Sequence, residues 1–438
     1  MGFLERNKYN LLIISLVMIF LGLSSSLIMN INKTASLPIA KGEKLYKVLL
    51  SDAGNNIEEV GNANIITGKN PNNYIWYSGH LWRAVSINED NTIKVVTEEA
   101  VNTLALTDDI DYFLNDKSKN GFLGNLNNYG DYIYLKNDSI WTKYEDNRSL
   151  GSITKPKNFT QETNPVGLLT TYDYQISYNG TTDSIGNSYL NNDTNWATYS
   201  YDKENYMIVN HNGKIKSMNK LLSSGIRPAI NLLSTIKVES GTGTKDDPYI
   251  IEKKAKDVLL NTRYSGEYVR FNNDLYRIVN TEEEITKLVA IDTIKNKKFS
   301  SESSLFDINK SDNIGYYLNH DWYQQLSNYS KELLTDGKFY VETMDGDKTY
   351  QDIAKNDYVT APIGLLRYGE LLSVSAKKDY YLITPYNKEY NKVIFTDSLS
   401  GAMKSNTELD IKVALYIRKD AKIKEGKGIK TNPFILTH

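Results

Sequence analysis

The chain has 438 residues, no cysteine and a formal net charge of −2. The lack of cysteine excludes disulfides, thiolate metal sites, a lipid-modified cysteine and cysteine nucleophiles, so stability must come from core packing. A charge near zero gives no electrostatic footprint for nucleic acid, and 40% hydrophobic residues over this length suffice for two or three packed domains.

The N-terminal segment contains a long apolar run. Residues 11–29 carry no charged side chain and follow a flank, 1–10, that contains Arg6 and Lys8. At about 1.5 Å per residue the run spans ~28 Å, close to the ~30 Å hydrocarbon thickness of a bilayer. The basic flank predicts a single-pass cell-membrane anchor with a cytoplasmic N-terminus and extracellular C-terminal domains. A cleaved signal peptide, with Ser24–Ser26 at the cleavage site, is the alternative and would give a secreted protein.

Residues 30–61 are expected to form a stalk or linker. They contain Pro38, and the run Glu43–Leu50 has the composition of a brief helix before the glycine and asparagines that follow. The first folded domain is therefore expected to begin after this segment.

A segment in the middle of the chain recurs without a gap at its end. Residues 225–251 align with residues 410–436, at a separation of 410 − 225 = 185 residues. Each copy reads as two strands joined by a glycine turn, followed by a short apolar strand that begins at a proline. Because each copy would end a domain, the repeat predicts a first domain over 62–252 and a second, diverged copy over 253–438.

The two expected domains also open alike. Tyr74 and Arg83 lie in apolar alternation around a Ser-Gly turn, and Tyr268 and Arg277 do so around an Asn-Asn-Asp turn, at a separation of 268 − 74 = 194 residues. This alternation predicts an antiparallel three-stranded meander in each domain. We expect each arginine to bridge to a carboxylate or to bind a backbone carbonyl.

A short helix with a Leu-Asn pair is expected next in each domain. Apolar residues three and four apart place one face of each helix in the core. These residues are Ile110, Phe113 and Leu114 in the first domain and Ile314, Tyr317 and Leu318 in the second. Nearby acids could suggest calcium, but they lack the glycine and the final glutamate of an EF-hand loop, so helix capping is the preferred interpretation. The acids are Asp108, Asp109, Asp111 and Asp116.

A Gly-Leu-Leu element follows the helix in both domains. Gly167 and Gly364 each come two residues after a proline, and a short strand that enters a helix fits both segments. A tryptophan-containing strand and a hairpin then lead to the repeated closing segment.

The order of these elements, ending in Gly225–Ala229 with the sequence Gly-Ile-Arg-Pro-Ala, resembles an uncharacterised domain family in surface proteins of low-GC Gram-positive bacteria. That family is similar to the C-type-lectin-like fold of formylglycine-generating enzymes. The resemblance covers most of 62–252 and, more weakly, 258–436, where Lys412 and Val413 replace the arginine and proline. It implies an α+β fold: two tandem C-type-lectin-like domains rich in short antiparallel strands, behind one N-terminal transmembrane helix.

The chain shows little sign of catalysis. Formylglycine generation would require active-site cysteines, the four histidines have no HExxH or metal spacing, and no Gly-x-Ser-x-Gly elbow is present. The calcium-dependent sugar-binding motifs of C-type lectins are absent too. A carboxylate-based hydrolase needs only two acidic side chains and stays open as a lesser alternative. We expect a protein that is not an enzyme and has no cofactor or metal.

These observations favour a membrane-anchored extracytoplasmic protein that acts in binding or adhesion. Its expected partner is a cell-envelope glycan or a surface protein, with no role for nucleic acid. Aromatic side chains suit such wet contacts, so Trp141, Tyr144 and Trp196, together with Arg227, are the candidate ligand-binding residues. The alternative function is a structural or assembly component of a cell-envelope complex.

Overall fold

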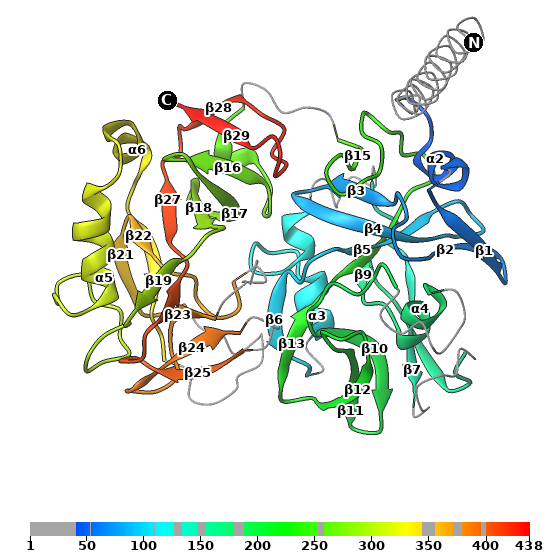
Figure 1. The fold of residues 1–438 in the computed structure, drawn as a ribbon, viewed down its shortest axis with the longest axis horizontal. Helices are drawn as coiled ribbons and strands as arrows, with labels where there is room; N and C mark the ends of the chain where they lie inside the picture. The colour runs from blue at the N-terminus through cyan, green and yellow to red at the C-terminus, as the bar shows by residue number, and fades with distance from the viewer. Residues whose placement is uncertain are drawn as a thin grey trace, which may run out of the picture.

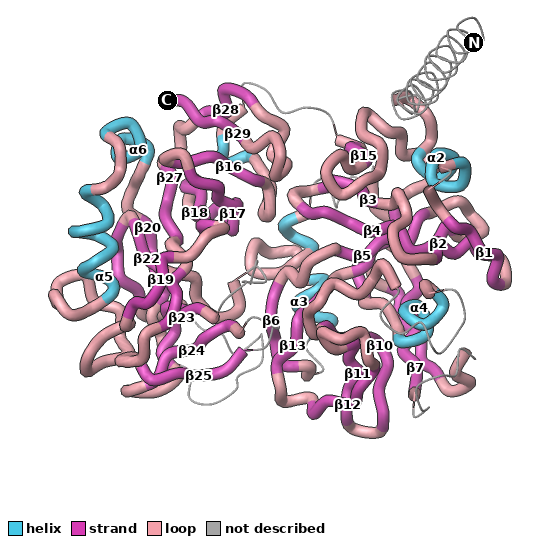
Figure 2. The backbone as a smooth tube through the Cα atoms, viewed as in Figure 1, coloured by secondary structure: helices cyan, strands magenta, loops and turns pink. Residues whose placement is uncertain are grey.

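A computed structural model describes residues 41–52, 54–107, 110–126, 134–146, 155–178, 188–252, 258–343, 355–370, 379–395 and 400–438 (Figure 1). Strands dominate it: 42% of the described residues lie in strands and 12% in helices (Figure 2). The expected α+β class is therefore wrong. Segments with helical spacing form helices of only four to seven residues, while the sheets form the framework.

The first half of the molecule, residues 41–252, contains two sheets. One has the path β1-β2-β4-β5-β14-β9, with β3 paired to β4 and β15 to β3; the other has the path β12-β11-β10-β13-β6, with β7 beside β10 and β8 beside β7. Their bounds are β1 (Asn56–Val60), β2 (Ala63–Thr67), β3 (Tyr74–Tyr77), β4 (His80–Ile87), β5 (Ile93–Thr97), β6 (Asn102–Ala105), β7 (Ile140–Glu145), β8 (Phe159–Thr163), β9 (Val166–Gly167), β10 (Trp196–Asp202), β11 (Asn205–Val209), β12 (Ile215–Asn219), β13 (Ser223–Ile226), β14 (Ala229–Leu232) and β15 (Tyr249–Ile250).

The second half, residues 258–438, contains two large sheets and one hairpin. The large sheets have the orders β22-β27-β18-β17-β16-β29-β28 and β19-β26-β23-β24-β25, and β20 pairs with β21. Their bounds are β16 (Tyr268–Phe271), β17 (Asp274–Glu282), β18 (Ile285–Ala290), β19 (Ile294–Lys297), β20 (Gly337–Tyr340), β21 (Tyr358–Ala361), β22 (Ile363–Gly364), β23 (Tyr380–Pro385), β24 (Tyr390–Ile394), β25 (Ser400–Lys404), β26 (Leu409–Ile411), β27 (Ala414–Ile417), β28 (Lys422–Glu425) and β29 (Phe434–Thr437).

Both halves have the same strand order. The path β9-β14-β5-β4-β3-β15 corresponds to β22-β27-β18-β17-β16-β29, and β12-β11-β10-β13-β6 corresponds to β25-β24-β23-β26-β19. In each half the closing strand runs parallel to the opening strand, with Tyr249 opposite Ile75 and Phe434 opposite Val269. The first and last strands of the shared framework are therefore neighbours in each half, and they lie at the top of both halves in Figure 1.

The repeated glycine turn has a steric cause. Gly241 and Gly426 both have positive φ, and a Cβ on them would lie 1.9 Å from the carbonyl oxygen of Pro248 and 2.2 Å from that of Pro433. Only glycine allows the turn to approach the closing strand this closely. The shared sequence signature therefore marks a shared backbone contact.

The described helices are α2 (Leu45–Ser51), α3 (Ile110–Asn115), α4 (Thr171–Ile176), α5 (Ile314–Tyr317) and α6 (Asn328–Leu333), and a π-helical turn over Leu318–Trp322 extends α5. The expected buried face of α3 is confirmed. The Leu-Asn pairs serve one purpose, because the amides of Asn115 and Asn319 donate to the carbonyls of Val166 and Ile363 (3.1 and 2.9 Å). Each asparagine thus ties its helix to the strand of the Gly-Leu-Leu element.

The expected transmembrane segment, residues 11–29, and its flank 1–10 lie outside the described residues. Within the part of the chain that the structure describes, no helix is both long enough and apolar enough to cross a membrane.

The expected stalk is partly folded into the first half. Of residues 30–61, the segment Leu45–Ser51 is helix α2 and Asn56–Val60 is strand β1, which pairs with β2. Leu45 and Leu49 are fully buried in the core, so this segment packs as part of the first half and is not a spacer. The sequence indicated the brief helix, but its packing into the first half was missed, because the two leucines are buried by residues that lie far along the chain.

The hydrophobic core runs through both halves as one continuous cluster. Polar contacts join the halves as well: Arg277 Nη1 lies 2.9 Å from Glu99 Oε2, and the amide of Asn102 donates to the carbonyl of Gly369 (2.9 Å). The expected carboxylate bridge of Arg277 is confirmed, and its partner belongs to the other half.

Candidate functional site

An ion pair between a lysine and a carboxylate recurs in the two halves. Lys94 Nζ lies 3.1 Å from Asp173 Oδ1 in the first half, and Lys287 Nζ lies 2.7 Å from Glu370 Oε1 in the second. Each carboxylate also accepts a hydrogen bond from the backbone amide three residues earlier, that of Thr170 (2.9 Å) or of Arg367 (2.8 Å). The pair and its support are therefore built in the same way twice.

The strand register shows that the two lysines are equivalent. Lys94 lies on β5 opposite Asn231 of β14, and Lys287 lies on β18 opposite Tyr416 of β27. The neighbouring pairs agree, because Val96 lies opposite both Arg83 and Ala229 just as Val289 lies opposite Arg277 and Ala414. The ion pair is thus a shared feature of the duplicated framework.

In the first half the ion pair opens onto a cavity of about 390 Å³. The side chains of Lys94 and Asp173 are 25% and 15% exposed, whereas those of Lys287 and Glu370 are only 2% and 7% exposed. A cavity of this size falls within the roughly 300–1,000 Å³ of small-molecule sites. The first pair can therefore contact a ligand, and the second is sealed.

The cavity wall combines aromatic rings with hydrogen-bonding groups. The rings come from β7 and α4, where Tyr144 and Tyr172 lie 6.4 Å apart between ring centroids in an edge-on arrangement. The polar wall consists of Ser86, Asn88, Lys94, Thr142, Lys155, Thr170 and Asp173, and the aromatic wall of Trp141, Tyr144 and Tyr172. Asp173 is the only carboxylate among the described residues that line the cavity.

The ion pair gives the cavity a fixed charge pattern. Burial opposes ionisation of Asp173, but the ammonium group of Lys94 and the hydrogen bonds from Thr170 hold the pKa of Asp173 below its ordinary value. Thr170 is also the N-cap of α4, and its hydroxyl accepts from the amide of Asp173. The carboxylate is therefore ionised and held in place at neutral pH.

Aromatic side chains fill the equivalent space in the second half. Lys287 Nζ lies 4.7 Å from the ring centroid of Phe339 and 5.5 Å from that of Tyr416. Tyr416 takes the place of the much smaller Asn231, and its hydroxyl donates to the carbonyl of Lys338 (2.8 Å). Phe339 lies against Gly364 as Trp141 lies against Gly167, so Tyr416 is the bulkier side chain that closes the second copy of the site.

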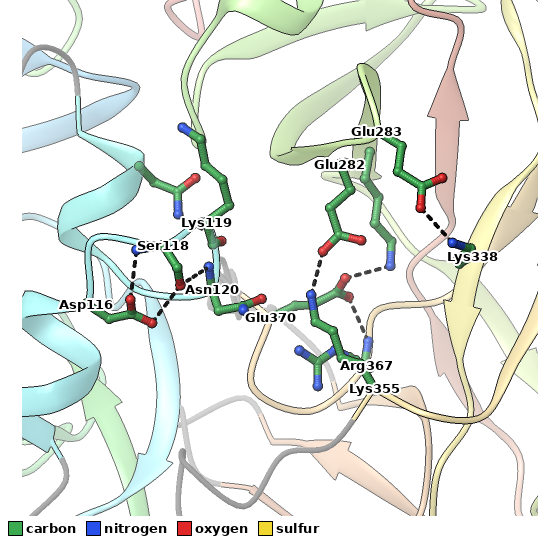
Figure 3. A network of polar contacts seen from close by, with 12 residues as sticks. Asp116, Ser118, Lys119, Asn120, Glu282, Glu283, Lys338, Lys355, Arg367 and Glu370 are labelled. Atoms are coloured by element: carbon green, nitrogen blue, oxygen red, sulfur yellow. Dashed lines mark hydrogen bonds and ion pairs between the residues drawn. The ribbon is translucent and has the colours of Figure 1, made fainter.

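Further ion pairs surround the sealed site. Figure 3 shows Glu370 beside Arg367, with Lys355 paired to Glu282 (2.5 Å) and Lys338 paired to Glu283 (2.6 Å). Each of the two lysines has a carboxylate partner of its own, whereas the buried Nε of Arg367 has no hydrogen-bond partner among the described residues. Within the part of the chain that the structure describes, the ion pair of the second copy does not open onto a charged cavity as the first one does.

The structure buries all four candidate ligand-binding residues. Trp141 and Tyr144 on β7 are 3% and 4% exposed, and their rings line the cavity. Trp196 and Arg227 are about equally buried but lie in the core. The structure therefore brings the four candidates together as two separate pairs, Trp141 with Tyr144 at the cavity wall and Trp196 with Arg227 in the core.

Arg227 has a structural role. Its guanidinium lies 4.9 Å from the Trp196 ring centroid and donates to the carbonyls of Thr97 (2.7 Å) and Leu190 (2.6 Å). Lys412 keeps the cation over a ring, with its Nζ 5.1 Å from the centroid of Tyr380. The change from arginine to lysine preserves the cation–π contact in the second half.

Sequence reasoning missed Lys94 and Asp173. Lys94 and its counterpart are 287 − 94 = 193 residues apart, whereas Asp173 and its counterpart are 370 − 173 = 197 residues apart, because the connecting turns differ in length. An aspartate in the first copy also corresponds to a glutamate in the second. The strand register reveals the equivalence at once. In sequence, only the aligned Gly-Leu-Leu elements close to Asp173 and Glu370 could have pointed to it.

The acids considered for calcium have local roles. The carboxylate of Asp116 accepts from the amide and the hydroxyl of Ser118 (2.7 and 2.8 Å), a turn visible in Figure 3. Asp111 pairs with Lys143, and Asp108 and Asp109 lie outside the described residues. Among the residues that the structure describes, no group of three or more His, Asp or Glu is placed to hold a metal ion.

No protein-family model matches the chain, and neither does any curated protein or solved structure.

Proposed function

We propose that the chain is a binding protein and that the cavity around Lys94 and Asp173 holds a saccharide unit of a cell-surface polymer. The observation that carries this proposal is the contrast between the two copies of one ion pair. The first opens onto a cavity of about 390 Å³, and the second is sealed by Phe339 and Tyr416. A purely structural ion pair would need no cavity in either half.

The chemistry of the wall suits a polyhydroxylated ligand. Sugar hydroxyls both donate and accept, and Asp173 offers an acceptor while Lys94 and Lys155 offer donors within one cavity. Aromatic walls present apolar faces to the C–H surfaces of a pyranose ring. The mixture of charged groups, hydroxyls and rings supports a saccharide over an entirely apolar ligand.

The same lining supports binding over hydrolysis. A glycosidase of the usual kind needs two carboxyl groups roughly 5–10 Å apart. The described lining residues provide Asp173 alone, and Lys94 holds it as an anion. The anchored, extracytoplasmic location that the sequence predicts would place this cavity where surface polymers occur.

The test is to occlude the cavity without removing a polar contact. Ala63 lies on β2 at the cavity wall, and Ala63→Trp would place an indole ring across it. We expect this variant to lose at least tenfold in affinity for soluble peptidoglycan oligosaccharides, measured by isothermal titration calorimetry. The matched control is Glu59→Trp, at an exposed position of the adjacent β1 that does not line the cavity.

Two results would count against the proposal. One is the absence of binding to a panel of cell-wall oligosaccharides by a chain whose circular dichroism shows it to be folded. The other is equal affinity of the Ala63→Trp and Glu59→Trp variants, which would place any binding elsewhere on the molecule.

A further inference from the structure

A second cavity, of about 440 Å³, lies at the junction of the two halves. Strands β3 and β4 of the first half and β16 and β17 of the second contribute to its wall, together with the turns that precede the closing strands. None of its lining residues lines the cavity around Lys94 and Asp173. It is therefore a separate site.

The junction cavity draws equivalent residues from the two copies. Leu81 and its counterpart Leu275 both line it, as do Lys245 and its counterpart Lys430. The leucines follow the first turn of each meander, and the lysines lie on the repeated turn before each closing strand. The duplication has thus placed two apolar side chains and two cations around one space.

The floor of the cavity is apolar. Trp76 and Tyr268, one from each half, lie 6.0 Å apart between ring centroids, and both belong with Ile429 to one small hydrophobic cluster. Leu81 and Leu275 pack against this cluster and are only partly buried. Covering apolar surface that remains accessible in a cavity favours the binding of an apolar ligand.

Charged side chains lie around the rim of the cavity, and they comprise three cations and two carboxylates. The cations are Lys245, Lys430 and Arg277, and the carboxylates are Glu99 and Asp246. Glu99 is neutralised by Arg277 across the junction, with Oε2 2.9 Å from Nη1. Lys245 lies 3.6 Å from Glu98, which balances the charges around the rim, and Lys430 has no ion-pair partner among the described residues. Lys430 is therefore the group of the rim that is available to a single negative charge.

We infer that the junction cavity binds a small amphipathic anion, an apolar body that carries one carboxylate, sulfonate or phosphate group. The apolar body lies on the floor formed by Leu81, Leu275 and Ile429, and the anionic group meets Lys245 and Lys430 at the rim. This site is independent of the saccharide cavity. Because its walls come from both halves, an occupant also bridges them.

The lining argues against other ligand classes. A saccharide needs many donors and acceptors along the floor, which here is made of leucine, isoleucine and aromatic side chains. A cationic ligand would face the two lysines. The histidine in the wall adds no charge, because burial and the nearby Arg277 lower the pKa of His80 to about 3. Charge complementarity thus favours an anion.

The test uses 8-anilino-1-naphthalenesulfonate, a fluorescent apolar anion, titrated into the intact chain. We expect saturable binding that dodecanoate displaces and dodecyltrimethylammonium does not. The double variant Lys245→Glu/Lys430→Glu should bind the probe at least tenfold more weakly. The control is Lys216→Glu/Lys220→Glu, two exposed lysines at and beyond β12, which lies at the opposite end of the first half from β15 (Figure 1).

A second variant checks the apolar contact. Leu275→Asn should weaken binding about tenfold with the lysines intact, and the midpoint of thermal unfolding shows whether this variant is folded. If it is not, the surface lysine variants still decide the question. Equal binding by the two double lysine variants, or equal displacement by the cationic detergent, would overturn the inference.

Discussion

Arg227 and its counterpart Lys412 each lie over an aromatic ring, but their other contacts differ. Arg227 reaches two backbone carbonyls with its planar guanidinium, whereas Lys412 sits 2% exposed over Tyr380 with Glu99, Arg277 and Asp292 as the charged groups that face it. Nε and Nη1 of the arginine are hydrogen-bonded, but its Nη2 has no hydrogen-bond partner among the described residues, and burial lowers the pKa of Arg227 to about 10. Burial and the nearby arginine oppose the charge of the lysine, and its pKa is lowered to about 8.

Lys412→Met is expected to stabilise the protein at neutral pH. The shift from 10.5 to about 8 corresponds to about 3 kcal/mol of free energy against the charged lysine in the folded state. Between pH 8 and 10.5 the unfolded chain holds more protons than the folded chain, so wild-type stability rises with pH in that window. Urea denaturation from pH 7 to 10 should show the advantage of the variant shrinking as pH rises; a constant difference would contradict this account.

Arg227→Lys is expected to destabilise the first half, although lysine is the natural residue in the second. The substitution removes the hydrogen bonds to the carbonyls of Thr97 and Leu190 and leaves a buried cation in their place. We expect a loss of about 3 kcal/mol in urea denaturation. The control is Lys419→Met at an exposed position, which should change stability by less than about 0.5 kcal/mol.

At the scale of elements, a glycine against an aromatic ring fixes the position of β7 and of β20. A Cβ on Gly167 would lie 2.2 Å from the Trp141 ring, and a Cβ on Gly364 would lie 2.6 Å from the Phe339 ring. The short strands β9 and β22 therefore press directly on aromatic side chains. In the first half the displaced ring would be one that lines the cavity around Lys94 and Asp173.

Gly167→Ala and Gly364→Ala form a matched pair. Both should cost about 1–3 kcal/mol in urea denaturation, because each overpacks a buried ring. Only Gly167→Ala should also weaken oligosaccharide binding, since only the first copy has an open cavity. Equal loss of binding in both variants would show that the effect comes from overall stability and not from Trp141.

The sequence was most informative where one feature was repeated. The paired Leu-Asn segments and the glycine turns at Gly241 and Gly426 occupy equivalent positions because each makes a backbone contact that any working copy must keep. The fold class failed because short segments with helical spacing formed single turns between strands. Helices this short depend on tertiary packing, which local periodicity does not report.

The site was less accessible to sequence reasoning. Trp141 lies in a stretch rich in polar residues, and it is buried because Gly167, far along the chain, has no side chain to exclude the ring. Lys94 and Asp173 meet through the order of the strands. Burial of an aromatic side chain and pairing of two distant charges are both tertiary properties, so neither left a local pattern.

At the scale of the whole molecule, the two halves are packed as one unit. Gly79 has positive φ, and a Cβ on it would lie 2.1 Å from the backbone oxygen of Ser265 in the other half. The core cluster is continuous across this junction. The ion pair between Arg277 and Glu99 adds a polar contact.

The intact chain is therefore expected to unfold in a single calorimetric transition. Gly79→Val should force the halves apart at this close backbone contact and split the transition into two, because each half retains its own sheets. The substitution Gly61→Val serves as the control, since Gly61 shares the positive φ of Gly79 but its Cβ would meet nothing within 4 Å. A single transition at the wild-type midpoint for Gly79→Val would show that the junction does not couple the halves.

The first and last strands of the shared framework are neighbours in each half, and this bears on how the molecule arose. When the first and last strands of a framework are neighbours, a second copy can be appended through a short connector without threading any strand through the existing sheets. Once two copies were joined, selection could act on each of them separately. One copy could keep an accessible cavity while larger side chains filled the equivalent space in the other. The junction between the two copies then formed a cavity that neither copy had alone.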